Sequence, residues 1–165
     1  GIVGFGRIGQ AVAEKARQFG MEIAYHNPSA RSIVGCESMS FDQLLATSDV
    51  VSIHVPLLPQ TCHLIDRTAL SRMKRSAYLI NTSRGPVVDE DALAWALREG
   101  IIKGAGLDVY EEEPKIHPGL LALENVVLVP HMASATAETR AAMYDLVARN
   151  VVDVLSGKPP VTPIP

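Results

Sequence analysis

Three glycines near the start of the chain have a spacing that suits phosphate binding. Gly4, Gly6 and Gly9 spell G-x-G-x-x-G at the end of an apolar run and the start of a helical pattern, which is the context that a dinucleotide fingerprint requires. The first glycine permits a tight turn, the second lets a pyrophosphate approach the backbone, and the third lets helix and strand pack closely. Glycines also serve plain turns, but this context favours a dinucleotide site that Arg7 and Ile8 also contact.

The residues after the second apolar run bear on the choice of nicotinamide cofactor. An NAD-binding domain usually places an acid there to hold the ribose 2′-hydroxyl, but this chain has Asn27. Ser29 and Arg31 follow closely, and an arginine can pair bidentately with a phosphate. The pattern therefore favours NADP, with NAD as the alternative if Arg31 is only a solvated loop residue.

Three side chains with complementary chemistry follow three later apolar runs. Arg84 lies in a loop that a glycine and a proline restrain, and its guanidinium can bind a carboxylate and polarise a carbonyl. Glu113 and His131 follow the next two runs, and a histidine held by a carboxylate can serve as a general acid or base. Taken alone, Arg84 could instead pair with Asp89 or Glu90. Together, the three residues predict a catalytic site.

The loop after the third apolar run begins at His54 and carries two prolines. We interpret it as a stiff loop beside the cofactor, and His54 as a structural or cofactor-lining residue rather than a catalytic one. Further cofactor contacts are expected in this loop and in the loop before Arg84, at Val55, Pro56, Thr61, Thr82 and Ser83.

The elements that must position these residues alternate between strand and helix. Strands are expected at the N-terminus and over 21–25, 49–55, 77–80, 104–109 and 126–129, and helices over 8–19, 41–46, 67–73, 89–98 and 137–155. In the first helix, Ile8, Val12, Ala16 and Phe19 share one face. The alternation predicts an α/β Rossmann-type doubly wound parallel sheet of about six or seven strands with helices on both faces. Ligands bind beyond the carboxyl ends of such strands, where the candidate residues fall.

Composition narrows the class of protein. The 165 residues carry a net charge of −3 without a Lys/Arg stripe, so neither nucleic acid nor a membrane is an expected partner. Cys36 and Cys62 have no metal or redox spacing, which favours reduced thiols in the cytoplasm and no metal site. One domain over 1–157 and a proline-rich tail over 158–165 are expected. Because a strand begins at residue 1, the chain is expected to be cut from a longer protein.

Five ordered motifs resemble the nucleotide-binding domain of the D-isomer-specific 2-hydroxyacid dehydrogenases, in particular the glyoxylate and hydroxypyruvate reductase branch. They are Gly-Phe-Gly-Arg-Ile-Gly at 4–9, His-Val-Pro-Leu at 54–57, Asn-Thr-Ser-Arg-Gly at 81–85, Gly-Leu-Asp-Val-Tyr-Glu-Glu-Glu-Pro at 106–114 and Pro-His-Met-Ala-Ser at 130–134. The resemblance implies that Arg84 holds the carboxylate and keto oxygen of a small 2-keto acid and that His131 donates a proton to that oxygen. It also implies that Glu113 orients His131 and that Asp108 binds the nicotinamide carboxamide.

Two features depart from the family pattern. Asn27 replaces the usual acid. The family builds its substrate domain largely from residues before the glycine motif, so this domain is expected to be missing from the fragment, and the fragment alone is expected to be inactive. The resemblance also implies a homodimer formed through this domain.

Two alternatives follow from the same resemblance. The first is a cofactor-sensing binding module, because the C-terminal-binding corepressors share the fold and keep the Arg, Glu and His. The second is formate dehydrogenase, which pairs its histidine with Gln, so that Glu113 argues against it. Turnover of glyoxylate or hydroxypyruvate, as opposed to recruitment of a short peptide motif, separates the enzyme from the binding module.

Overall fold

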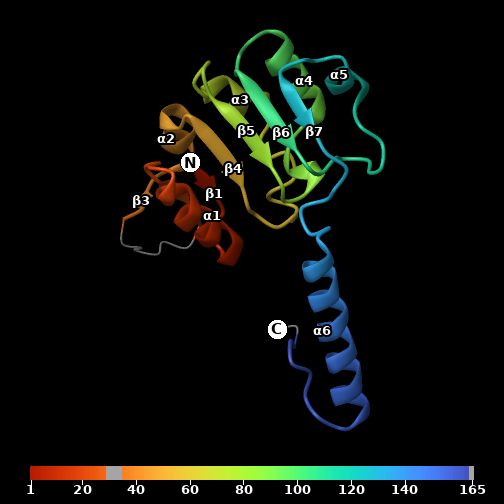
Figure 1. Ribbon diagram of the computed structural model, residues 1–165. Helices are drawn as coiled ribbons and strands as arrows, with labels where there is room; N and C mark the ends of the chain where they lie inside the picture. Colours follow the sequence, from red (N-terminus) through yellow and green to blue (C-terminus); the bar gives the residue numbers. More distant parts are fainter. Residues whose placement is uncertain (29–34, 164–165) are drawn as a thin grey trace. The chain divides into compact units, whose positions relative to one another are not determined.

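The structure is a computed structural model that describes residues 1–28 and 35–163. It contains two compact units, Gly1–Pro130 and His131–Pro165. The first unit holds the sheet and its covering helices, and the second holds the last helix and the tail that follows it (Figure 1).

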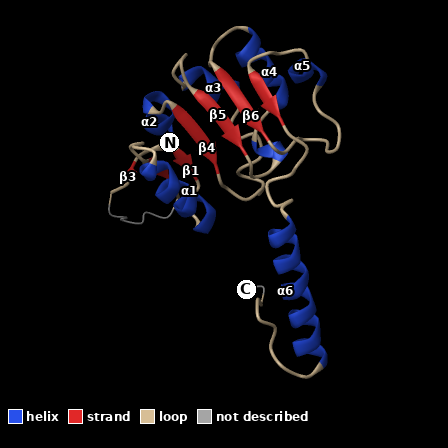
Figure 2. Ribbon diagram, viewed as in Figure 1, coloured by secondary structure: helices blue, strands red, loops and turns tan. Residues whose placement is uncertain are grey.

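Seven parallel strands form the sheet of the first unit, among the residues that the structure describes (Figure 2). They are β1 (Ile2–Val3), β2 (Ala24–His26), β3 (Glu37–Ser38), β4 (Val50–Ile53), β5 (Tyr78–Asn81), β6 (Gly104–Leu107) and β7 (Val126–Leu128). Their order is β3-β2-β1-β4-β5-β6-β7. Successive strands are added on one side of β1 as far as β3 and on its other side from β4 onward. The neighbouring strands β1 and β4 therefore mark the topological switch point, where such sheets bind ligands. The predicted Rossmann-type α/β fold is confirmed.

Helices cover both faces of the sheet. They are α1 (Arg7–Gln18), α2 (Phe41–Thr47), α3 (Arg67–Arg72), α4 (Glu90–Arg98) and α5 (Pro118–Leu121), and a 3-10 turn, η1, spans Gly85–Val87. Side chains of Ser40, Asp66 and Asp89 accept a backbone N–H at the starts of α2, α3 and α4. These N-caps fix where each helix leaves its loop.

Each face of the sheet has its own apolar core. Leucines of α2, α3, α4 and α5 are buried against one face, including Leu44, Leu70, Leu93 and Leu120. On the same side, the guanidinium carbon of Arg67 on α3 lies 3.7 Å from the ring centroid of Trp95 on α4. Against the other face, Ala13 of α1 packs in a cluster with Ile2, Phe5, Ile23 and Tyr25. The rings of Phe5 and Tyr25 are stacked there with centroids 4.2 Å apart.

Two of the four apolar residues that share one face of α1 are largely exposed. Ile8 and Phe19 are 69% and 87% exposed, whereas Gly9 and Ala13 are the buried residues of the helix. A β-carbon at Gly9 would overlap the carbonyl oxygen of Gly4. The helix lies too close to the strand for a large side chain between them, so small residues make the contact.

Several element boundaries also differ from the expectation. The second strand begins at Ala24, and the sequence patterns predicted neither β3 nor α5. A strand of two residues and a helix of four are too short to show a period.

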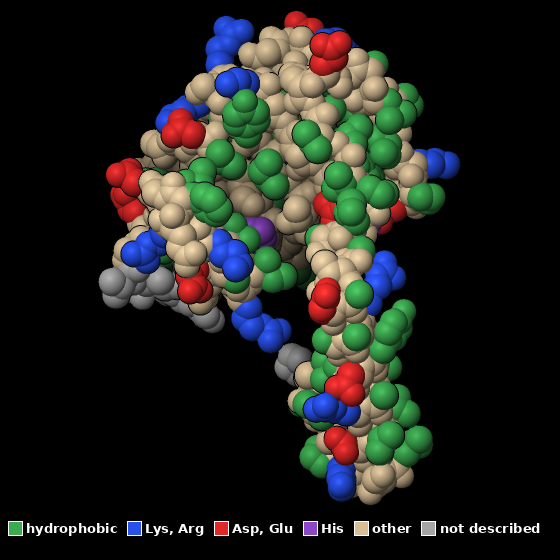
Figure 3. Space-filling view, viewed as in Figure 1, with side chains coloured by type: hydrophobic (Ala, Val, Ile, Leu, Met, Phe, Trp, Pro, Cys, Tyr) green, Lys and Arg blue, Asp and Glu red, His purple; other side chains and the backbone are tan. Residues whose placement is uncertain are grey.

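The second unit consists of α6 (Ala137–Leu155) and the tail that follows it. The Thr136 hydroxyl caps α6, and Asn150 exchanges two hydrogen bonds with Thr162 in the tail, at 2.8 and 3.2 Å. All residues of α6 are described and none is buried, and Figure 3 shows apolar side chains along its exposed surface. In the described part of the chain, no helix has the length and apolar character needed to cross a membrane.

Candidate active site

The glycine motif forms the tight turn from β1 into α1. Gly4 has a φ of +93°, and a β-carbon there would lie 2.7 Å from the carbonyl carbon of His54. Gly6 differs from Gly4, because a β-carbon there would meet no atom within 4 Å. Gly6 is also the N-cap of α1, with no side-chain cap and no acid in the first turn. This open helix start, with free N–H groups, fits the pyrophosphate of a dinucleotide.

Asn27 joins the end of β2 to the glycine motif. Its Oδ1 accepts a hydrogen bond of 3.2 Å from the Phe5 N–H, so the side chain supports the turn itself. Position 27 therefore provides an amide, and no negative charge, beside the loop that would hold the cofactor. Ser29 and Arg31, the other two residues expected to choose the cofactor, lie outside the described residues.

The loop after β4 is held by its own polar groups. The His54 Nε2 lies 2.8 Å from the Ser52 hydroxyl, and burial lowers the pKa of the His54 imidazole, which favours a neutral ring. The Thr61 hydroxyl donates to the Pro56 carbonyl at 2.7 Å and accepts from the Leu58 N–H at 2.8 Å. His54 thus has a structural hydrogen bond, and the Thr61 hydroxyl closes the loop on itself.

Asn81 shapes the loop that carries Arg84. Its Oδ1 accepts from the Ser83 N–H at 3.0 Å and from the Ser83 hydroxyl at 2.9 Å, and its Nδ2 donates to the Arg84 carbonyl at 3.0 Å. The exposed Arg84 guanidinium donates to the Ser83 carbonyl. Such side-chain bonds to nearby backbone fix a loop. Sequence reasoning missed this role of Asn81, although an Asn at the end of a strand is a recognisable turn signal.

The two acids considered as partners of Arg84 are engaged elsewhere. Asp89 accepts from the Ala92 N–H at the start of α4, at 2.9 Å. Glu90 is buried and accepts from the Glu111 N–H at 3.0 Å. Both carboxylates therefore accept hydrogen bonds from backbone N–H groups, and the Arg84 residue is exposed.

The segment after β6 carries Asp108 and Glu113. Asp108 is 4% exposed, and its N–H donates to the Asn81 carbonyl at 3.0 Å. The Glu113 carboxylate accepts from the Tyr110 N–H at 3.1 Å. The Tyr110 hydroxyl in turn lies 2.9 Å from the Val129 carbonyl oxygen. The structure thus brings the segment of Glu113 and the loop of Arg84 together at the carboxyl ends of β6 and β5.

His131 is the first residue of the second unit, and it is exposed with a φ of +49°. A positive φ is uncommon for a residue with a side chain. The backbone bends at this residue.

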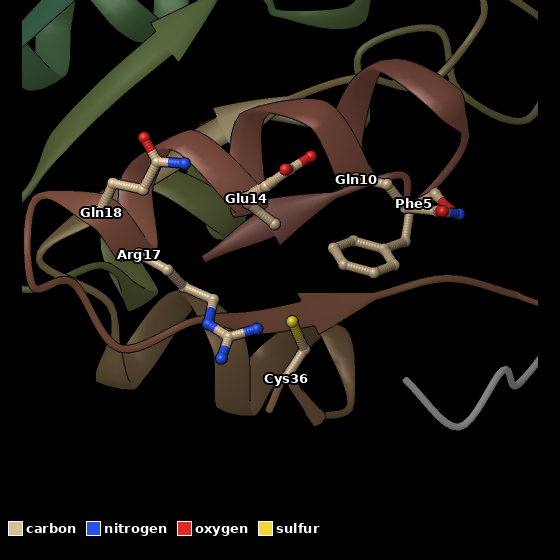
Figure 4. Close-up of a pocket in the computed structure, with 7 residues that line it drawn as sticks. Phe5, Gln10, Glu14, Arg17, Gln18 and Cys36 are labelled. Atoms are coloured by element: carbon tan, nitrogen blue, oxygen red, sulfur yellow. The ribbon is translucent and has the colours of Figure 1, made fainter. Parts of the chain in front are cut away.

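A cavity of about 520 Å³ lies along the flank of α1 (Figure 4). Phe5, Gln10, Glu14, Arg17 and Cys36 are among its lining residues. Of the described residues expected to bind the cofactor, none lines it, so we do not assign it to the candidate site. Among the described residues, no group of three or more His, Cys, Asp and Glu side chains could hold a metal ion.

Comparison with known proteins gives the family. Residues 1–133 match the model of the D-isomer specific 2-hydroxyacid dehydrogenase NAD binding domain. The chain is 52% identical to a glyoxylate reductase of Thermococcus litoralis over 97% of its own length and 50% of the relative. It is 53% identical to a glyoxylate reductase of Korarchaeum cryptofilum, over 97% of the chain and 50% of that relative. The chain therefore spans about half the length of these relatives.

Solved structures agree with this assignment. An NADPH-dependent glyoxylate/hydroxypyruvate reductase of Sinorhizobium meliloti, in complex with NADP and malonate, matches with a TM-score of 0.95 and 40% identity, over 99% of this chain and 51% of that one. A glyoxylate reductase from Paecilomyes thermophila matches with a TM-score of 0.94 and 41% identity, over 99% and 51%. The chain belongs to the D-isomer specific 2-hydroxyacid dehydrogenases, and it contains their NAD(P)-binding domain.

Proposed function

We propose that this chain is the cofactor-binding half of a reductase that converts glyoxylate or hydroxypyruvate, both small 2-keto acids, into the 2-hydroxy acid. The observation that supports this most strongly is the similarity to glyoxylate reductases across nearly the whole chain. A substrate domain of the same protein completes the cleft and grips the substrate carboxylate, and residues 1–157 form the cofactor-binding domain. The protein works as a cytoplasmic homodimer, and its two free cysteines suit a reducing compartment.

Three residues act on the substrate in this proposal. Arg84 binds the carboxylate and polarises the keto oxygen, because a guanidinium fork matches both groups. His131 holds a proton on its imidazole and delivers it to that oxygen as the hydroxyl forms. Glu113 orients the imidazole. The exposed Arg84 side chain and the fixed loop beneath it support this role.

The motif residues hold the cofactor in the same proposal. Gly4, Gly6 and Gly9 form the turn beside which the pyrophosphate lies, and Asp108 holds the nicotinamide carboxamide. The open surroundings of Gly6 support this placement. When bound, the reduced nicotinamide supplies the hydride that the keto carbon accepts. The remaining contacts come from Arg7, Ile8, Val55, Pro56, Thr61, Thr82 and Ser83.

NADPH is the preferred cofactor in our proposal. Asn27 gives the end of β2 no charge that would repel a 2′-phosphate, and Ser29 and Arg31 follow it in the sequence to receive one. A solved relative that is NADPH-dependent and was crystallised with NADP supports the same choice.

Turnover by the full-length protein tests the proposed function. Glyoxylate, hydroxypyruvate and pyruvate are each offered with NADPH and with NADH, and oxidation of the cofactor is followed by its absorbance. We expect reduction of the first two acids, with NADPH preferred. Tight cofactor binding without turnover of any 2-keto acid would instead favour the cofactor-sensing binding module.

A further inference from the structure

Two glutamates that play no part in the chemistry above connect the loop of Arg84 to the segment of Glu113. We propose that Glu90 and Glu111 are a positioning pair that fixes these two segments relative to each other, and so sets the geometry of the substrate site. The proposal rests on the proposed reductase function, in which Arg84 and Glu113 act on one substrate.

The pair is held by two reciprocal hydrogen bonds. The Glu90 N–H donates to Glu111 Oε1 at 2.9 Å, and the Glu111 N–H donates to Glu90 Oε1 at 3.0 Å. Each carboxylate thus binds the backbone of the other residue, across 21 positions of sequence. Each bond joins the backbone of one residue to the side chain of the other, so the two side chains together link the two main chains at two points.

Glu90 is the first residue of α4, which gives the pair a rigid base. The N–H groups of the first helical turn have no partner within the helix, so the Glu111 carboxylate caps one of them. The positive end of the helix dipole also favours a carboxylate at this place. The Glu90 side chain is 6% exposed, and water therefore competes little with its bond to the Glu111 N–H.

From Glu111 the connection continues to Glu113 through Tyr110. The Tyr110 N–H donates to the Glu113 carboxylate, so the backbone that Glu90 holds is adjacent to the group that places Glu113. On the other side, a β-carbon at Gly85 would overlap the Tyr110 carbonyl and lie 2.5 Å from the Glu111 nitrogen. Gly85 directly follows Arg84. A shift of the Glu111 backbone would therefore move both catalytic segments.

Charge alone does not account for the pair. Burial is the main cause that raises the pKa of the Glu90 carboxyl; the hydrogen bond from the Glu111 N–H lowers this pKa, and the nearby Glu111 carboxylate raises it. The His63 Nε2 lies 3.2 Å from the Glu111 Oε1. Hydrogen-bond geometry is thus the property that the pair supplies. A neutral side chain with the same acceptor oxygen should supply it as well.

Three variants of Glu111 in the full-length enzyme separate geometry from charge. Glu111→Gln keeps the chain length and the acceptor oxygen, Glu111→Asp keeps the charge but is one methylene shorter, and Glu111→Ala keeps neither. Glu112→Ala is the matched control, because Glu112 is adjacent and its side chain is 80% exposed. The measurements are kcat and KM for glyoxylate, the Kd of NADPH, and hydrogen exchange at the amides of Glu90 and Glu111.

We expect kcat to depend on whether the side chain at position 111 still places an acceptor oxygen at the Glu90 N–H. Displacement of a reacting group by about 1 Å can lower the rate by about 10²-fold, so Asp and Ala at position 111 should lower kcat by about 10-fold or more. Gln should stay within about 3-fold of the parent protein. The Kd of NADPH should change by a smaller factor than kcat, because the glycine motif that holds the pyrophosphate is not among the partners of the pair, although Ser83 and Asp108 lie in the segments that the pair joins. Exchange at the Glu90 amide should accelerate in the Asp and Ala variants only.

Two outcomes would overturn the positioning role while leaving the reductase intact. One is a parent-like kcat in folded Asp and Ala variants, and the other is a Gln variant as slow as Ala. If the parent protein itself reduces no 2-keto acid, the proposed function fails, and the amide exchange still reports whether Glu90 and Glu111 hold each other.

Discussion

Gly85 and Tyr110 are packed backbone to backbone, so closely that a methyl group at position 85 would overlap the Tyr110 carbonyl. Gly85 is buried and opens the 3-10 turn after Arg84. Tyr110 is 4% exposed and binds the Glu113 carboxylate through its N–H. The loop of Arg84 and the segment of Glu113 therefore share a contact that only glycine permits.

The first prediction concerns this contact. Gly85→Ala should destabilise the protein by about 1–3 kcal/mol, the usual range for overpacking a buried site. It should also lower kcat, because Arg84 and the Glu113 segment must separate. Urea unfolding and steady-state kinetics measure the two effects. An unchanged unfolding midpoint would show that the turn relaxes without cost.

The second prediction separates the roles of two motif glycines. Gly6→Ala should leave the free energy of unfolding nearly unchanged, because the new methyl group meets no atom within 4 Å and the φ of −75° suits alanine. The same methyl group should block the approach of the pyrophosphate and raise the Kd of NADPH by about 10-fold or more. Gly4→Ala is the contrasting variant and should destabilise the fold, because it adds strain at a φ of +93°. Calorimetric titration and thermal unfolding test both variants, and tight NADPH binding by Gly6→Ala would contradict the assigned role.

The third prediction concerns cofactor choice. Asn27→Asp should reverse a preference for NADPH, because a carboxylate repels the 2′-phosphate and accepts a hydrogen bond from a free ribose hydroxyl. The fold should persist, since Asp can still accept from the Phe5 N–H that Asn27 binds. Arg31→Ala is the complementary variant and should weaken NADPH while leaving NADH nearly unchanged. Equal affinity of the parent protein for both cofactors would remove the basis of this prediction.

The fourth prediction concerns the proton donor. His131→Asn in the full-length enzyme should lower kcat by about 10²–10⁴-fold, the usual contribution of a positioned acid–base group. The Kd of NADPH should change little, which a fluorescence titration can check. His117→Asn is a suitable control, because His117 pairs with Asp91 at 3.1 Å on the α4 side of the sheet. A kcat near that of the parent protein would exclude His131 from the chemistry.

The fifth prediction is a dependence of stability on pH. Burial raises the pKa of Glu90 above its ordinary value of 4.5, so the folded protein holds this proton more tightly than the unfolded chain does. The stability linked to Glu90 is therefore fully present below the unfolded pKa and is lost as the pH rises through the folded pKa. Glu90→Gln removes this loss and keeps an acceptor oxygen. The free energy of unfolding of the variant minus that of the parent should therefore increase from pH 4 to pH 7. Urea titrations that give the same difference at both pH values would contradict the prediction.

The fold and the motif loops could be predicted because their signals are local. The alternation of apolar runs and helical patterns predicted a parallel sheet, and the glycine spacing predicted the turn between β1 and α1. The exposure of Ile8 and Phe19 could not be predicted in this way. It depends on how closely α1 approaches the sheet at Gly9, which is a tertiary property.

The pairing of Glu90 with Glu111 was beyond sequence reasoning for a related reason. Asn81 acts within its own loop, where a turn signal exists, but Glu90 and Glu111 each bind a backbone group of a segment distant in sequence. The chain carries no periodic or motif signal for a bond that joins positions 21 residues apart. The roles assigned to Arg84, Glu113 and His131 remain predictions, as do those of Ser29 and Arg31.

Trp95, which contacts Arg67, gives this chain an intrinsic fluorescent probe. Trp95 is the single tryptophan of the chain, and it is half-buried where α3 meets α4. Excitation near 295 nm would therefore sample one helical layer only, on the face of the sheet opposite to α1. A shift in emission would follow loosening of α3 against α4, whereas a rearrangement confined to the glycine motif would leave the spectrum unchanged.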